Sequence, residues 1–122
     1  MIPVRRVRAW IPPVLWAGVI FALSSIPSLE SGLRPVWDLV LRKIAHAAEF
    51  AILAALLLRA LAPQTKRAVP VAFFLALFYA ASDEWHQTFV ENRTGAWADA
   101  LIDAIGIIVG LAVYASRIKN RG

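Results

Sequence analysis

The sequence predicts an all-α fold, an integral membrane bundle of four transmembrane helices that forms a single domain over residues 1–122. Three observations support this prediction. Hydrophobic residues make up 60% of the chain and the mean hydropathy is +0.64, whereas about 45–50% of the residues of a soluble domain are apolar. The apolar residues fall into four blocks of about the length that crosses a hydrocarbon core of about 30 Å. Basic residues stand at the ends of these blocks, as topological anchors do.

The first helix is expected over about residues 10–27. Pro12 and Pro13 then fall in its first turn, where a missing N–H group costs little. Three arginines within residues 5–8 precede it, as in a secretory signal. The apolar stretch is long for a signal and no convincing small-residue cleavage site follows it, so we interpret it as a retained span. Trp16 is interpreted as an interfacial anchor near the start of this span.

The second helix is expected over about residues 39–61, and the fourth over about residues 97–115. The third is expected over about residues 69–88. Its apolar part, residues 69–81, rises only about 20 Å, which is too short to cross the hydrocarbon core. The third helix therefore spans the membrane only if the polar residues from Ser82 onward continue it.

The basic residues predict the orientation of the bundle. If the N-terminus is cytoplasmic, nine of the 13 basic residues lie on the inner side, namely Arg5, Arg6, Arg8, Arg59, Lys66, Arg67, Arg117, Lys119 and Arg121. The positive-inside rule thus predicts cytoplasmic N- and C-termini. Because these residues stand at helix ends and not among aromatic residues in a patch, the net charge of +5 does not indicate a nucleic-acid partner. The absence of cysteine excludes disulfides and thiolate chemistry.

The acidic residues lie away from the inner helix ends. They are Glu30, Asp38, Glu49, Asp83, Glu84, Glu91, Asp99 and Asp103. At a rise of about 1.5 Å per residue, His46, Asp83 and Asp103 each lie roughly 20 Å from the inner end of their helices, inside the outer leaflet. Glu49 lies about 15 Å along its helix. Within roughly one further turn lie Lys43, Glu84, His86, Gln87 and Asp99.

Helical spacing also places these groups on common faces. On the fourth helix Asp99 and Asp103 share a face with Gly106 and Gly110, whose small-x-x-x-small spacing lets another helix approach closely. We expect this glycine strip to pack within the bundle, with dimer formation as the alternative. Ionisable groups at this depth face a bundle interior or a wet cavity and indicate a functional site, although a polar network that only fixes helix packing is the other interpretation.

Two blocks of the sequence resemble the VanZ-like family of small bacterial membrane proteins. One is "RKIAHAAEF", residues 42–50, and the other is "SDEWHQTFVENRTGAWADALIDAIGIIVG", residues 82–110. The family pattern falls on Lys43, His46, Glu49, Asp83, Glu84, Gln87, Arg93, Asp99 and Gly106. The sequence departs from it in two places: Glu91 and Asn92 replace the Pro-Gly that often precedes Arg93, and Asp103 stands where Asn is common.

The resemblance implies a multi-pass protein of the bacterial cytoplasmic membrane that is connected with the cell envelope. The family's namesake is linked to low-level resistance to teicoplanin, a glycopeptide antibiotic. The resemblance does not imply a defined reaction, so the activity has to be argued from the site residues themselves.

We expect the polar site to combine two groups of residues. The expected catalytic residues are His46, Glu49, Asp83, Glu84, His86 and Asp99, and the expected substrate-binding residues are Lys43, Gln87, Arg93 and Asp103. His46 can exchange a proton near neutral pH, and Arg93 can bind a phosphate or carboxylate with its two-pronged guanidinium. A divalent metal could bind through His46, Asp83, His86 and Asp99, but no motif has metal-specific spacing, so the cofactor stays undetermined.

Three functions remain open from the sequence. The first is a membrane enzyme that acts on a lipid-linked or phosphate-bearing envelope substrate from the outer face. The second is a protein that binds such a lipid or envelope precursor without catalysis. The third is proton-coupled transport, for which Asp, Glu and His relays inside a membrane are typical. Against transport, the ionisable groups within the spans stop near Glu49 and do not continue through the inner half.

Overall fold

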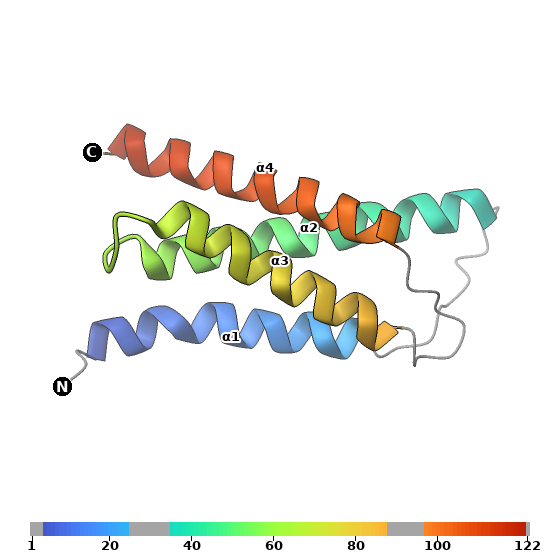
Figure 1. Ribbon diagram of the computed structural model, residues 1–122, viewed down its shortest axis with the longest axis horizontal. Coiled ribbons are helices and arrows are strands. Elements are labelled where there is room, and N and C mark those ends of the chain that lie inside the picture. The colour runs from blue at the N-terminus through green and yellow to red at the C-terminus, as the bar shows by residue number, and fades with distance from the viewer. Residues whose placement is uncertain (1–3, 25–34, 88–96, 122) are drawn as a thin grey trace.

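The computed structural model describes the backbone of residues 4–24, 35–87 and 97–121, and the side chains of residues 4–23, 40–86 and 100–118. The described chain consists of four helices: α1 (Val4–Ser24), α2 (Pro35–Leu61), α3 (Ala68–Gln87) and α4 (Trp97–Arg121). All four are long and apolar enough to cross a membrane. The predicted all-α bundle of four transmembrane helices is therefore confirmed (Figure 1).

The helices lie alongside one another and alternate in direction along the chain (Figure 1). The start of α1, the end of α4 and the turn of residues 62–67 lie at one end of the bundle, which we call the terminal end. The end of α1, the start of α2, the end of α3 and the start of α4 lie at the other, which we call the site end. As predicted, the polar residues after Ala81 continue α3, which reaches Gln87.

Three helix boundaries differ from the expected ones by four residues or more. Helix α2 begins at Pro35, before its expected start near residue 39. Helix α1 begins at Val4, so Pro12 and Pro13 lie in its interior and the expectation that they occupy the first turn is wrong. Arginine is a good helix former, which allows the helix to include the basic segment before the apolar block. Helix α4 extends to Arg121, beyond the expected end near residue 115, because its polar last turns lie beyond the apolar segment and need no burial.

Helix α2 packs most extensively against α4, and small residues allow the close approach. A Cβ atom added to Gly106 or Gly110 would come closer than 3.0 Å to the backbone of Ala47 or Ala51 in α2. Membrane helices associate through such close packing because lipid is as apolar as their side chains. The glycine strip thus packs within the bundle, as expected from its spacing.

The bundle is polar inside at one end and apolar outside. Large apolar side chains such as Phe78 and Leu101 are exposed, at 75% and 68%. Asp83, Glu84 and Asp103 are buried, at 3%, 8% and 1%. This arrangement suits a hydrocarbon solvent, in which apolar side chains face the lipid and costly polar groups face the interior.

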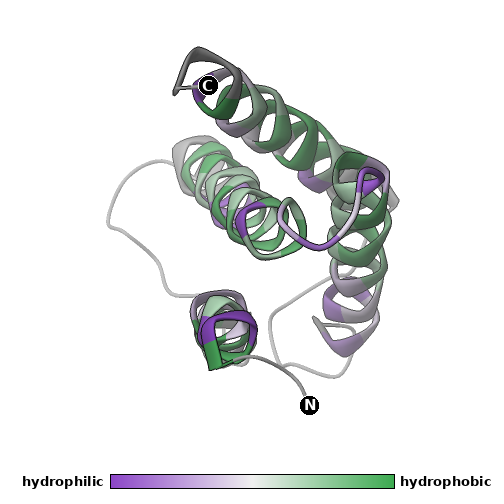
Figure 2. Ribbon diagram, turned by 90° about the vertical axis from the view of Figure 1, so that its left-hand side faces the viewer, coloured by the Kyte–Doolittle hydropathy of each residue, from purple (hydrophilic) through white to green (hydrophobic). Residues whose placement is uncertain are grey.

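Helix α1 is the least buried of the four and lies beside α2 and α3, on the opposite side of the bundle from most of α4 (Figure 2). Two side-chain hydrogen bonds fasten it. The indole of Trp16 donates to the backbone carbonyl of Glu49 in α2 at 2.8 Å, and the hydroxyl of Tyr79 in α3 donates to the carbonyl of Ala17. Trp16 is therefore half-buried in a helix contact, a packing role that the interpretation as an interfacial anchor did not include.

Removing these two bonds should loosen α1 without unfolding the bundle. We expect Tyr79→Phe to lower the free energy of unfolding by about 0.5–1.5 kcal/mol, because it loses one hydrogen bond and keeps its ring. Trp16→Phe should lower it further, because the smaller phenyl ring loses packing as well as the hydrogen bond. The double variant should show faster amide hydrogen exchange confined to α1. Tyr114→Phe is the matched control, since the half-buried Tyr114 makes no side-chain hydrogen bond within the described residues. Equal exchange in α1 of the double variant and the control would contradict this role.

Candidate functional site: a buried histidine between two carboxylates

The register of α2 against α4 places Asp103 beside His46. Gly106 packs on Ala47 and Gly110 on Ala51, so the two helices run parallel and in step. Asp103 lies one turn before Gly106, toward the site end, and His46 directly precedes Ala47. The close glycine contact therefore holds the Asp103 carboxylate within reach of the imidazole.

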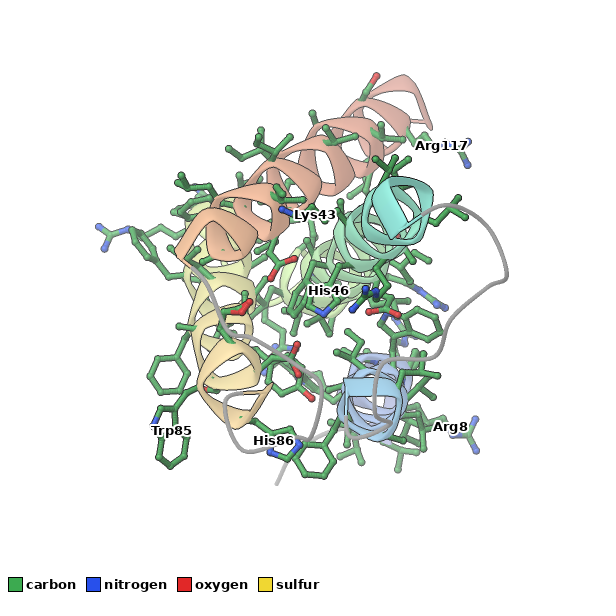
Figure 3. The ribbon with its side chains drawn as sticks, turned by 90° about the vertical axis from the view of Figure 1, so that its right-hand side faces the viewer. Arg8, Lys43, His46, Trp85, His86 and Arg117 are labelled. Atoms are coloured by element: carbon green, nitrogen blue, oxygen red, sulfur yellow. The ribbon has the colours of Figure 1, made fainter. Side chains whose placement is uncertain are left out.

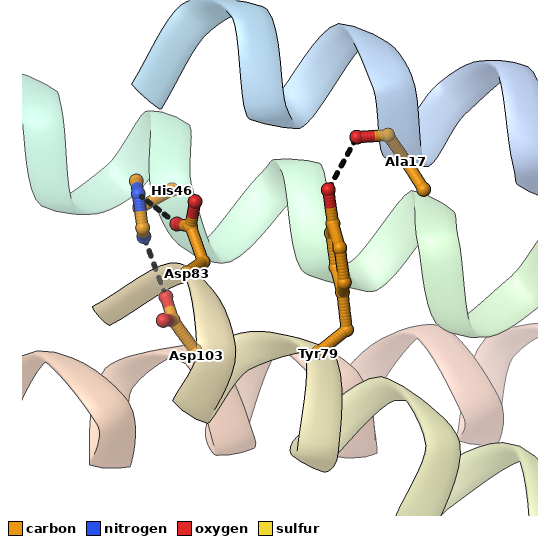
Figure 4. A network of polar contacts seen from close by, with 5 residues as sticks. All are labelled: Ala17, His46, Tyr79, Asp83 and Asp103. Carbon is orange, nitrogen blue, oxygen red and sulfur yellow. Dashed lines mark hydrogen bonds and ion pairs between the residues drawn. The ribbon is translucent and has the colours of Figure 1, made fainter. Parts of the chain in front are cut away.

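The imidazole of His46 lies between carboxylates from two other helices (Figure 4). Its Nδ1 is 2.8 Å from Oδ1 of Asp103 in α4, which is a hydrogen bond. Its Nε2 is 3.4 Å from Oδ2 of Asp83 in α3, an ion-pair distance beyond a normal hydrogen bond. The side chain of His46 is 16% exposed and those of the two aspartates are 1% exposed. The three helices thus meet in a cluster that is almost fully removed from the bundle surface.

The geometry of the cluster limits which of its groups can carry a proton. A neutral imidazole donates from one ring nitrogen and accepts at the other, whereas an imidazolium donates from both. A carboxylate oxygen faces each ring nitrogen of His46, so the cluster contains either an imidazolium or a protonated carboxyl group. Neither oxygen of Asp83 has a hydrogen bond within the described residues. The arrangement can therefore hold one proton between the imidazole and a carboxylate.

Two aromatic residues lie next to the cluster on the side toward the terminal end. Phe50, one turn along α2, is fully buried, with its ring centroid 5.6 Å from that of His46. Tyr79, one turn before Asp83 on α3, lies 6.1 Å from Phe50. The sequence analysis missed both residues, although the four-residue spacing from His46 and Asp83 is the signal that could have found them.

Arg42 is a second group that the sequence analysis did not assign to the site. It lies one turn before His46 on α2, and its Nε is buried with no hydrogen-bond partner within the described residues. The four-residue spacing places Arg42 and His46 on the same side of the helix. A guanidinium in this position offers donors to an anionic group.

The other expected site residues are distributed around the site end (Figure 3). Lys43 is half-buried and extends from α2 toward α4, and Glu84 is buried on α3. Glu49 is half-buried one turn beyond His46 toward the terminal end. The side chains of Gln87 and Asp99 and the whole of Arg93 lie outside the described residues.

His86 lies apart from the cluster. Its ring stacks on Phe21 of α1, with centroids 4.5 Å apart and planes inclined by 24°. Figure 3 shows it at the edge between α3 and α1, whereas His46 points into the interior. Within the described residues no three His, Asp or Glu side chains are arranged to bind a metal ion. Among the described side chains, the structure brings His46, Asp83 and Asp103 together in one cluster.

Four membrane-length helices around an interior histidine–carboxylate cluster define a small polytopic membrane protein with a polar site inside the helix bundle. The sequence pattern of the VanZ/LLP1 family matches residues 2–119, nearly the whole chain. The chain belongs to this family, which confirms the resemblance found in its two motif blocks. No curated protein and no solved structure matches the chain.

Proposed function

We propose that this VanZ/LLP1 protein binds a lipid-linked or phosphate-bearing envelope substrate at the site end of the bundle, and that His46 transfers a proton there. One observation supports this most directly: an imidazole inside a membrane bundle lies between buried carboxylates from two neighbouring helices. Such groups are costly within a membrane, so their presence favours a functional role over packing alone.

The unequal distances suggest different roles for the two aspartates. The short bond from Nδ1 to Asp103 fixes the orientation and the tautomer of His46, as a carboxylate does when it supports a catalytic histidine. The longer contact at Nε2 leaves this nitrogen able to exchange a proton with Asp83 or with a substrate oxygen. Asp103, expected as a substrate-binding residue, is better explained as the positioning residue of His46. An asparagine at this position would keep an oxygen acceptor for the Nδ1–H group.

Cations near the cluster support an anionic substrate. Arg42 and Lys43 precede His46 by about one turn, and the buried Nε of Arg42 would gain an acceptor from a bound phosphate. Arg93 would add a second guanidinium from the connection between α3 and α4. The membrane position favours a substrate whose anionic group is attached to a lipid, because the apolar part can then stay in the bilayer.

The family link supports a role in the bacterial cell envelope. We propose a cytoplasmic-membrane location with both termini in the cytoplasm, so that the cluster faces the outer leaflet, where envelope precursors are exposed. In a glycopeptide-susceptible bacterium, expression of the protein should then lower susceptibility to teicoplanin, and His46→Ala should remove that effect.

Purified protein in neutral detergent allows a direct test with polyprenyl phosphate and the uncharged polyprenol of equal length. Native mass spectrometry should show retention of the phosphate over the alcohol, and Arg42→Gln should weaken retention about tenfold because a charged hydrogen bond is lost. His46→Ala and Asp83→Asn should abolish any conversion of the lipid. Ser82→Ala is the control, because this exposed residue adjoins Asp83 and bonds only to its own helix.

The outcomes separate binding from catalysis. Equal retention of phosphate and alcohol would contradict an anionic substrate. Stable retention of intact polyprenyl phosphate with no conversion would contradict proton transfer and would leave non-catalytic binding as the function. Proton uptake into liposomes that contain only this protein would instead support transport.

A further inference from the structure

A cavity lies at the terminal end of the bundle, between the start of α1 and the end of α2. It has a volume of about 660 Å³, which is within the range of roughly 300–1,000 Å³ typical of ligand sites. Six residues line it: Val4, Arg5, Arg8, Ala9, Arg59 and Pro63. None of the lining residues is acidic, so the cavity combines three positive charges with apolar walls.

The three arginines are not neutralised by the protein. Arg5, Arg8 and Arg59 are exposed, and none of them has an ion pair within the part of the chain that the structure describes. They come from two helices that are far apart in sequence, so the tertiary fold, and not a local run of charge, brings them around one cavity. Three guanidinium groups around one cavity repel one another and favour the binding of an anion.

The position of the cavity in the bundle indicates the source of that anion. Arg5 and Arg8 lie in the first two turns of a candidate span, and Arg59 lies in the last turn of another. Such positions fall at the level of lipid headgroups. Val7, between the two arginines of α1, and Ile11, one turn beyond Arg8, are 53% and 50% exposed and can contact an acyl chain.

We propose that this cavity is a binding site for the headgroup of an acidic phospholipid. The arginines would bind the phosphate through paired N–H donors, and the apolar residues of α1 would lie along the acyl chains. Basic pockets between membrane helices bind acidic headgroups in this way. The site is separate from the His46 cluster, since Arg59 is about 20 Å from His46 along α2.

The test uses purified protein in neutral detergent, titrated with phosphatidylglycerol or with phosphatidylcholine of the same chain length. Native mass spectrometry should show preferential binding of phosphatidylglycerol. Arg8→Gln/Arg59→Gln should weaken it by about fivefold for each arginine removed. The matched control is Arg67→Gln/Arg117→Gln, which removes the same charge from exposed positions that do not line the cavity.

The control and the competitors give distinct results. We expect the control variant to bind phosphatidylglycerol like the unaltered protein, because neither of its substitutions touches this cavity. Equal weakening in the two double variants would show a general charge effect and would overturn the site. Equal binding of phosphatidylcholine would overturn the acidic headgroup, and displacement of the lipid by millimolar inorganic phosphate would show that a free anion, not a lipid, is recognised.

Discussion

Replacing Gly106 by alanine is expected to lower the free energy of unfolding by about 1–3 kcal/mol, the cost of overpacking a close-packed interior. The added Cβ would come closer than 3.0 Å to backbone atoms of Ala47, which cannot move aside as a flexible side chain can. Helices α2 and α4 would therefore have to separate. Gly110→Ala should have a similar effect through Ala51. Thermal melting in detergent, followed by circular dichroism, measures the loss.

Gly18→Ala is the matched control for this prediction. A Cβ added to Gly18 in α1 meets nothing within 4 Å, so the substitution should gain up to about 1 kcal/mol from helix propensity alone. A melting temperature of Gly106→Ala equal to or above that of the unaltered protein would contradict the close contact of α2 and α4. Because the glycine contact also sets the position of Asp103, we expect Gly106→Ala to impair any activity of His46.

The second large effect is expected at His46. His46→Phe keeps an aromatic ring but leaves the buried carboxylates of Asp83 and Asp103 without their common partner. Breaking a buried ion pair by removing one member costs about 3–5 kcal/mol, because the remaining charge stays buried. We therefore expect a marked loss of stability in detergent, whereas Ser82→Ala, at an exposed neighbour of Asp83, should change stability by less than about 0.5 kcal/mol.

Removing the two carboxylates as well should restore the stability that His46→Phe loses. In His46→Phe/Asp83→Leu/Asp103→Leu no ionisable member of the cluster remains, and apolar replacement of a buried ionic cluster is often neutral or stabilising by about 1–4 kcal/mol. We expect the triple variant to be at least as stable as the unaltered protein. Its failure to recover stability, or an unchanged stability of His46→Phe alone, would contradict the buried cluster.

The triple variant also separates packing from function. If the cluster only fixed helix packing, a stable apolar replacement would keep every property of the protein. If the cluster serves a substrate, the same variant should be stable and inactive. Stability and activity measured on one protein thus distinguish the two interpretations of the polar groups that the sequence left open.

The sequence by itself determined the helices and the common level of their polar groups along the helix axes. Apolar blocks of membrane length predicted the four helices, and a constant rise per residue predicted that His46, Asp83 and Asp103 share one level. Both predictions depend on distances along the helix axis, which the residue numbers supply. The motif blocks around His46 and Asp83 also predicted the family that the match over residues 2–119 confirms.

Only the tertiary structure decided which of these groups touch. Contact between helices depends on their rotation and separation, which are set by packing between residues far apart in the sequence, such as Gly106 on Ala47. This packing brings Asp103 to His46, while His86, at nearly the same depth, stacks on α1 instead. It also joins Arg8 and Arg59 around one cavity. Depth is a local property of each helix, whereas lateral contact is a property of the whole bundle.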